Sequence, residues 1–83
     1  MQIEFDSAKR NKNLVERGLD FARAGEVFKS LHFTGQAYRF ITVGLLDARL
    51  VVLVWTLRGE VRRIISLRKA NDREKTFYAH HLD

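Results

Sequence analysis

The residues best suited to chemistry are the arginines that crowd the second half of the chain. From position 58 onward the basic side chains are Arg58, Arg62, Arg63, Arg68, Lys69, Arg73 and Lys75. A guanidinium group binds two phosphate oxygens through parallel N–H donors and keeps its charge across the physiological pH range. Several of them together would stabilise the negative charge that builds up on a phosphodiester during cleavage without a metal.

Two predicted turns bring some of these arginines together. If Asp47-Ala48 and Gly59-Glu60 are two-residue hairpin loops, the pairing of the strands on either side follows directly. Side chains at one end of one sheet face would then be Arg39, Thr56 and Arg63, with Arg58 close by. Further along the same face, the expected rows are Ile41, Val54 and Ile65, and then Val43, Val52 and Leu67. The only acid expected near the arginines is Glu60, on the other face, so the sequence predicts that they bind an anion.

Cleavage of RNA also needs a group that removes the proton of the 2′-hydroxyl and one that protonates the leaving oxygen. Histidines suit this role poorly here. His32 is predicted to be an ordinary strand residue, and His80 and His81 are predicted to be solvated near the end of the chain. Tyr78, beside Phe77, fits an aromatic anchor of the last helix on the sheet.

The opposite sheet face is predicted to carry an apolar row with Phe40, Trp55 and Ile64, flanked by Tyr38, Leu57 and Arg62. Such a row is either core beneath a helix or a surface that a partner covers. Because apolar rows occur on both faces of a small domain, we expect the chain to associate with itself or with a partner.

Local patterns predict the elements that position these residues. A short strand at Ile3 to Phe5 precedes a helix that Asp6 or Ser7 caps and Gly18 ends, and Asp20 caps a second helix that ends near Lys29. Alternation then predicts antiparallel strands between Leu31 and Arg68, with turns at Thr34-Gly35-Gln36, Asp47-Ala48 and Gly59-Glu60. Asn71 and Glu74 form a capping box for a last helix.

The predicted fold is therefore a single α+β domain over residues 1–83, with an antiparallel sheet of four to five strands, two N-terminal helices and one C-terminal helix.

The chain has 83 residues, 46% of them hydrophobic, and a formal net charge of +5, which favours polyanionic partners or simply a solubilised surface. It has no cysteine, which excludes a cysteine zinc site and fits a reducing cytoplasm. No apolar run approaches the roughly 18 residues of a membrane span.

Several segments, taken in order, resemble the BrnT toxins. Residues 63–78 follow the family pattern RIISxRxAxxRExxxY, and Arg39 and Gly44 follow RxxxxG. The N-terminal part resembles FEWDxxKxxxNxxKHGVxFxxAxxVF through Glu4-Phe5-Asp6, Lys9, Asn13, Gly18, Phe21, Ala24, Val27 and Phe28. Each motif is weak alone, but their order makes the resemblance fairly specific.

The resemblance implies a fold like that of RelE toxins and microbial ribonucleases. It implies a cytoplasmic endoribonuclease toxin of a bacterial type II toxin–antitoxin system, which inhibits translation and is neutralised by a BrnA-type antitoxin. Operator DNA would be bound only through the antitoxin, and the toxin would form a homodimer or a hetero-oligomer with its antitoxin. Neither a cofactor, a metal nor a membrane is expected.

On this hypothesis, the catalytic residues are Arg39, Arg58, Arg63 and Tyr78, and the residues that bind RNA phosphates are Lys9, Arg62, Arg68 and Lys69. Two departures from the family pattern stand out. Arg17 replaces the histidine of the Lys-His-Gly motif, and the segment between Phe28 and Arg39 is shortened. They keep open an alternative, in which the protein is a catalytically weakened module that binds a partner or nucleic acid.

Overall fold

The computed structural model describes residues 2–36 and 38–82, the last three of them by backbone alone, and bears out the predicted α+β order. Its elements are β1 (Ile3–Glu4), α1 (Ser7–Arg17), the 3-10 helix η1 (Phe21–Arg23), α2 (Ala24–Lys29), β2 (Phe33–Gln36), β3 (Phe40–Leu46), β4 (Arg49–Arg58), β5 (Val61–Lys69) and α3 (Asp72–Leu82). No helix within this described part is long and apolar enough to cross a membrane.

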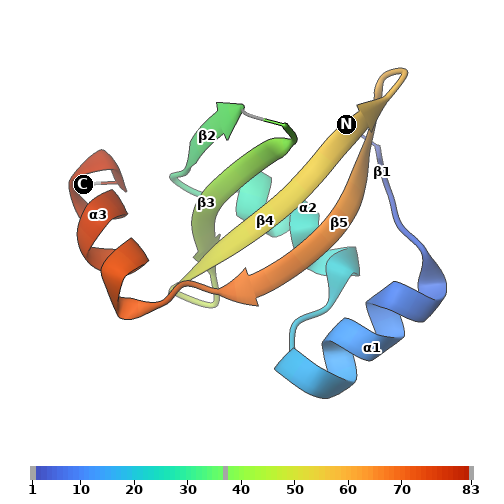
Figure 1. Ribbon diagram of the computed structural model, residues 1–83, viewed down its shortest axis with the longest axis horizontal. Helices are drawn as coiled ribbons and strands as arrows, with labels where there is room; N and C mark the ends of the chain where they lie inside the picture. The colour runs from blue at the N-terminus through green and yellow to red at the C-terminus, as the bar shows by residue number, and fades with distance from the viewer. Residues whose placement is uncertain (1, 37, 83) are drawn as a thin grey trace.

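The strands form one sheet in the order β1-β5-β4-β3-β2. Strands β2 to β5 are an antiparallel meander, as predicted. The sheet is antiparallel as predicted except at one edge, where β1 pairs with β5 in parallel (Figure 1). Between these two strands the chain passes through α1, α2 and the meander, and this long connection lets β5 return in the direction of β1.

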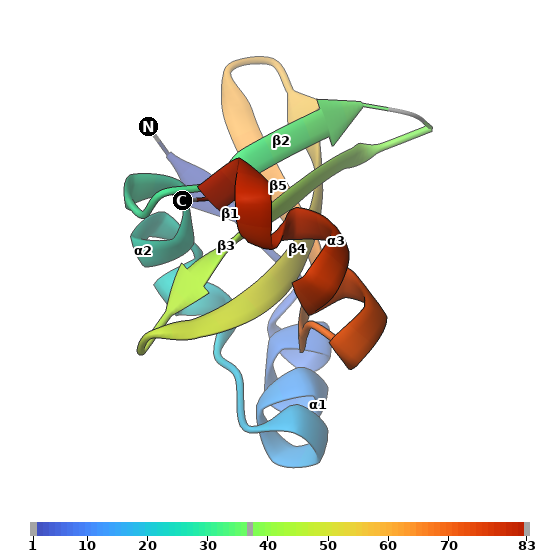
Figure 2. The ribbon, with the colours of Figure 1, turned by 90° about the vertical axis from the view of Figure 1, so that its left-hand side faces the viewer.

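Helices lie on both sides of the sheet. Figure 2 shows α2 on one side of the strands and α3 on the other, with α1 at the lower end. The main core lies between the sheet and the N-terminal helices and consists of Phe21, Ala24, Val27, Leu46, Val51, Leu53, Trp55, Ile64 and Leu67. A smaller core on the α3 side contains Val43, Val52 and Ala70, with Leu50 and Tyr78 packed against it. Towards the β4–β5 hairpin, the α3 side of the sheet stays more open.

Both predicted two-residue turns are confirmed. Leu46 pairs with Arg49 and Arg58 pairs with Val61. Asp47 and Ala48 have positive φ angles of 53° and 61°, and Gly59 has a φ of 63°. Positive φ at both central residues matches the twist of the flanking strands, which is why such turns favour tight hairpins. The register of β3, β4 and the start of β5 follows from these turns.

The turn predicted at Thr34-Gly35-Gln36 is wrong, because these residues belong to β2. Thr34 pairs with Thr42 and Gln36 with Phe40, so the connection lies between Gln36 and Phe40. The Thr34 and Thr42 hydroxyl groups form a hydrogen bond of 2.8 Å, which supports the strand pairing across the glycine-containing segment. The predicted strand residue His32 lies just before β2.

The cross-strand neighbours predicted for Ile65 and Leu67 are wrong because β5 contains a bulge. Trp55 pairs with Ile64, but Val54 pairs with Ser66, so the extra residue Ile65 interrupts the alternation. Leu67 consequently pairs with Leu53 and lies in the main core, whereas the prediction placed it beside Val52. A bulge leaves no clear trace in the sequence, since β-branched and polar residues occur on both sides of it.

The predicted row of Phe40, Trp55 and Ile64 is confirmed, and it is core beneath a helix. Trp55 is 5% exposed, stacks on Phe40 with ring centroids 4.4 Å apart, and meets Phe28 of α2 edge-on at 5.4 Å. Its indole Nε1 donates a 2.9 Å hydrogen bond to Thr42 Oγ1, which satisfies both buried polar groups. Phe40 and Trp55 therefore need no partner to cover them, whereas Tyr38, two residues before β3, is 96% exposed.

Helix α1 is anchored to β5 by one buried amide. Asp6 caps the helix by accepting a hydrogen bond from the Lys9 amide, and Gly18 ends it at a φ of 70°, both as predicted. The Asn13 side chain is 7% exposed and its Nδ2 donates 2.9 Å hydrogen bonds to the carbonyl oxygens of Leu19 and Leu67. This contact positions α1, and with it Lys9, against the sheet.

We predict that Asn13→Ala lowers the free energy of unfolding by about 1 to 3 kcal/mol, because two buried carbonyl oxygens lose their donor. Asn11→Ala is the matched control, since Asn11 is exposed on the same helix and gains the same helix propensity. Urea unfolding of both variants provides the measurement. Equal stability of the two variants would show that Asn13 does not anchor α1.

Candidate active site

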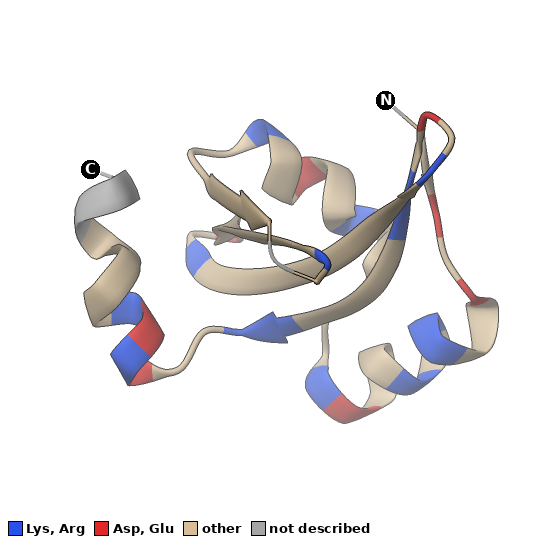
Figure 3. Ribbon diagram, turned by 45° about the horizontal axis from the view of Figure 1, so that its top comes forward, with Lys and Arg blue, Asp and Glu red and all other residues tan. Residues whose placement is uncertain are grey.

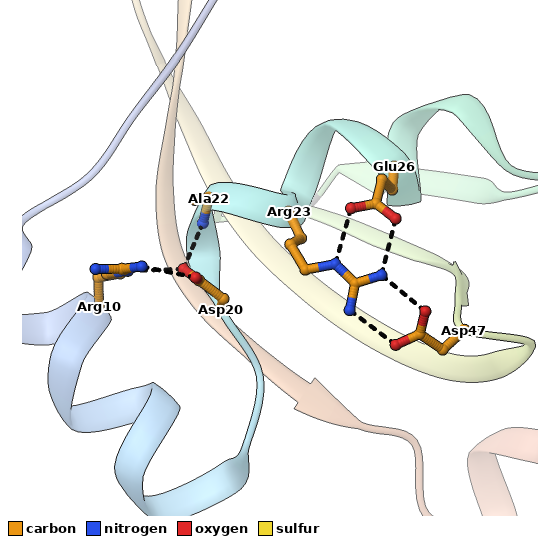
Figure 4. Close-up of polar contacts among 6 residues, drawn as sticks. All are labelled: Arg10, Asp20, Ala22, Arg23, Glu26 and Asp47. Carbon is orange, nitrogen blue, oxygen red and sulfur yellow. Dashed lines mark hydrogen bonds and ion pairs between the residues drawn. The ribbon is translucent and has the colours of Figure 1, made fainter.

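The arginines divide into those bound to carboxylates within the fold and those with free donors. Arg10 donates two 2.7 Å hydrogen bonds to Asp20, which lowers the pKa of Asp20 to about 2. Arg23 binds Glu26 at 2.8 Å and Asp47 at 2.7 Å, each through two hydrogen bonds (Figure 4). These arginines join α1 to η1 and α2 to the β3–β4 turn, so their donors are used by the fold.

Arg68, predicted to bind phosphate, belongs to the same structural group. Its guanidinium donates hydrogen bonds of 2.7 and 2.8 Å to the two carboxylate oxygens of Glu74. Glu74 also completes the predicted capping box, because it accepts from the Asn71 amide and its own amide donates to Asn71 Oδ1. The Arg68 hydrogen bonds lower the pKa of Glu74 to about 2. Arg68 therefore connects the end of β5 to the start of α3.

Arg62, also predicted to bind phosphate, lies on the sheet face that the N-terminal helices cover. Its guanidinium carbon lies 4.0 Å from the ring centroid of Phe28 and 4.8 Å from that of Trp55. Burial lowers the pKa of Arg62, and its buried Nε has no hydrogen-bond partner among the described residues. Since neighbouring strand residues point to opposite faces, Arg62 and Arg63 lie on different sides of the sheet.

Arg58 and Arg63 form a different kind of cluster, around Glu4. The register pairs Arg63 with Thr56 on one side and with Glu4 on the other, so the predicted Thr56–Arg63 neighbours are confirmed. A Glu4 carboxylate oxygen lies 3.4 Å from Arg58 Nε and 3.7 Å from Arg63 NH1. Neither contact is a hydrogen bond, and within the described residues neither guanidinium donates one. Figure 3 shows the charged segments of β1 and of the β4–β5 hairpin side by side.

Glu4 is the charged residue of this cluster that the sequence patterns did not predict. Glu60 was expected to be the only acid near these arginines, and this prediction is wrong because β1 places Glu4 directly beside Arg63. Alternation at Ile3 to Phe5 predicted the strand but not its partner in the sheet. One signal was available in the sequence, because a strand with two arginines needs an acidic neighbour to limit their repulsion.

A cavity opens at the same place. Its volume is about 510 Å³ and it is lined by Glu4, Arg58, Gly59 and Val61. The side chain of Arg58 is 62% exposed and that of Arg63 is 30% exposed, so solvent reaches both guanidinium groups. Two guanidinium groups without hydrogen-bonded partners, beside an open cavity, can bind the oxygens of a phosphate.

Arg39 lies near this end of the sheet but outside the strand ladder. It directly precedes β3, is exposed, and its guanidinium carbon lies 6.0 Å from the ring centroid of Tyr38. The predicted row of three side chains is therefore confirmed for Thr56 and Arg63 only. The structure places Arg39 next to Phe40, the partner of Trp55, at the edge of the cluster.

Tyr78 lies at the other end of the same sheet face. Its ring packs against the smaller core and lies 5.7 Å from the ring of Phe33 and 4.9 Å from that of Phe77. Val52, in that core, is four residues along β4 from Thr56, or about 13 Å at a rise of about 3.3 Å per residue. The structure therefore does not bring Tyr78 close to Arg58 and Arg63.

The two remaining predicted phosphate ligands, Lys9 and Lys69, lie in different parts of the structure. Lys9 lies near the start of α1, where the pKa of Asp6 is lowered mainly by the Lys9 amide and also by the Lys9 and Arg63 charges. Lys9 also lines a cavity of about 390 Å³ between α1 and the β5 bulge, with Lys12 and Arg17. Lys69 lies at the opposite end of β5, beside Arg49 and Lys75.

His32 adds no general base at this cluster. His32 is exposed and its Nδ1 lies 2.9 Å from the Ser30 carbonyl oxygen, before β2. The predictions for the side chains of His80 and His81 fall outside the described residues.

The fold defines the class of this protein. A 1.1 Å crystal structure of the Brucella abortus ribonuclease toxin, BrnT, superposes with a TM-score of 0.69 and 28% sequence identity, covering 87% of this chain and 99% of that chain. The sheet with its flanking helices is therefore the fold of a bacterial ribonuclease toxin. No curated protein sequence matches the chain significantly.

The sequence assigns the chain to a family. Residues 5–74 match the model of the ribonuclease toxin BrnT of type II toxin–antitoxin systems. This match spans most of the chain, and it agrees with the resemblance found in the motifs. The protein belongs to the BrnT family of ribonuclease toxins.

We predict that Glu74→Gln lowers stability at pH 7 by about 1 to 2 kcal/mol, because Arg68 loses its charged partner. Since the pKa of Glu74 is lowered to about 2 in the folded protein, its contribution is present above its ordinary value near 4.5. The contribution disappears as pH falls from about 4.5 towards 2, so the two proteins should converge there. Thermal melts from pH 7 to 2 test this, with Glu60→Gln as control, since Glu60 is exposed and makes no ion pair with a described residue. A difference independent of pH would contradict it.

Proposed function

We propose that this chain is an endoribonuclease that cleaves RNA without a metal and thereby inhibits translation. The observation that carries the proposal is the pair formed by Arg58 and Arg63, which flank Glu4, are reached by solvent and are not hydrogen-bonded within the described fold. The other carboxylate-bound arginines have short, paired hydrogen bonds. Family membership supports RNA as the substrate.

In the proposed reaction Arg58 and Arg63 bind the non-bridging oxygens of the scissile phosphate. As the ribose 2′ oxygen attacks phosphorus, negative charge grows on those oxygens, and preorganised donors stabilise it more than the ground state. Arg39, which directly precedes β3, and Lys9, near the start of α1, are proposed to bind neighbouring phosphates. Tyr78, predicted to be catalytic, is proposed instead to contact the RNA strand further along the sheet face, because it packs against the smaller core at the other end of that face.

We further propose that a BrnA-type antitoxin neutralises the protein in the bacterial cytoplasm. The family supports an antitoxin partner. Apolar side chains that such a partner could cover are exposed on the α3 side of the sheet, among them Phe33 and Ile41, each 38% exposed, and on α3 itself, where Phe77 is 60% exposed. Covering this face would also block RNA from the site.

We predict that the purified chain cleaves total RNA in the presence of EDTA, and that Arg63→Ala lowers the rate about 100-fold or more, since a preorganised donor stabilises the transition state by that order. The stability of Arg63→Ala should change by less than about 1 kcal/mol, because the pair with Glu4 is partly exposed and lacks a hydrogen bond. Growth inhibition on expression should be relieved in parallel.

Arg73→Ala is the matched control, because Arg73 is an exposed arginine on α3 that also lacks a hydrogen-bonded partner within the described residues. It removes the same charge far from the proposed site and should keep most of the activity. Intact RNA with the wild-type chain would favour the alternative of a toxin-like, partner-binding module. Equal cleavage by wild type and Arg63→Ala would preserve the enzyme and reject this site.

A further inference from the structure

We propose that Glu4 is the general base of the cleavage reaction, an inference that rests on the proposed ribonuclease function. Its place is defined by three strands, since Glu4 in β1 pairs with Arg63 in β5, and Arg63 pairs with Thr56 in β4. The Glu4 side chain is 38% exposed and lines the cavity beside Arg58. Among the described residues it is the only carboxylate in contact with both arginines.

The geometry distinguishes Glu4 from the structural carboxylates. Asp20, Asp47 and Glu74 accept hydrogen bonds of 2.7 to 2.8 Å from arginines through both oxygens. Glu4 instead stands 3.4 and 3.7 Å from its two arginines without a hydrogen bond. Its lone pairs remain available to accept a proton, and the guanidinium donors remain available to bind phosphate. A carboxylate beside a bound phosphate is within reach of the adjacent ribose hydroxyl.

The proposed step balances without a metal. The proton of the 2′-hydroxyl passes to Glu4 while the 2′ oxygen bonds to phosphorus. The bond between phosphorus and the 5′ oxygen breaks, and the leaving oxygen takes a proton from water. The products are a 2′,3′-cyclic phosphate and a 5′-hydroxyl end, and Glu4 then gives its proton to the hydroxide that remains. The charged groups around Glu4 are Arg58 on β4, Arg63 on β5, and Asp6 and Lys9 at the start of α1.

The test separates a base from a residue that only positions the arginines. Glu4→Gln should lower the cleavage rate about 100-fold or more, the usual range for a general base. Its affinity for a non-cleavable 2′-O-methyl RNA oligonucleotide should be equal to or higher than that of wild type, because a negative charge beside the phosphate is removed. The wild-type rate should fall towards acid pH as the carboxylate takes up a proton, and this dependence should be absent from the residual rate of Glu4→Gln. Glu60→Gln, an exposed acid on the neighbouring hairpin, should change neither rate nor affinity.

Glu4→Asp is the control for misfolding, because it keeps the negative charge and shortens the side chain by one methylene. It should lose rate but keep the acid limb of the pH profile. Weaker binding of 2′-O-methyl RNA by Glu4→Gln, with the pH profile unchanged, would overturn the inference and leave Glu4 as a positioning residue. Full activity of Glu4→Gln beside an inactive Arg63→Ala would also overturn it, while the proposed function stands. Absence of cleavage by the wild-type chain would overturn both.

Discussion

The parallel pairing of β1 with β5 is the constraint on which the proposed site depends. Without it, Arg58 and Arg63 would lie at the end of an antiparallel hairpin with no carboxylate in their row. With it, Glu4 enters the same row and reduces the repulsion between the two guanidinium groups without engaging their donors. The pairing involves only Ile3 and Glu4, and Ile3 packs against the main core. A two-residue strand therefore links the hydrophobic core to the charged cluster.

The remaining charges show how a small basic domain separates stability from binding. Arg10, Arg23 and Arg68 connect elements that the backbone alone does not join, each through short hydrogen bonds to both oxygens of a carboxylate. Arg62 packs its planar group on Phe28 and Trp55. The structure thus uses charge-assisted hydrogen bonds and stacking for the fold, and leaves a small number of cations for a ligand. The net charge alone could not distinguish these two groups.

Sequence patterns predicted most of the fold, because its main determinants are local. Asp6, Gly18 and the Asn71–Glu74 box act within a few residues, and the turns at Asp47 and Gly59 determine the pairing beside them. The patterns failed where a distant partner decides the outcome. The bulge at Ile65, the strand at Thr34 to Gln36 and the position of Glu4 all depend on neighbouring strands far away in the sequence. For the site, one turn was enough to predict that Arg63 lies beside Thr56. The distance between Tyr78 and the arginines, and the ion pair of Arg68 with Glu74, depend on how α3 packs, which the sequence patterns did not predict.

The central claim is that Arg58 and Arg63 hold the scissile phosphate at the end of the sheet, and a structure with bound RNA tests it most directly. A crystal structure with a short 2′-O-methyl RNA would show where the backbone lies. The account predicts a phosphate whose oxygens lie about 2.7 to 2.9 Å from guanidinium nitrogens of both arginines, with Glu4 beside the adjacent ribose. A strand bound along α1 or at Lys69, with no phosphate at Arg58 and Arg63, would contradict it.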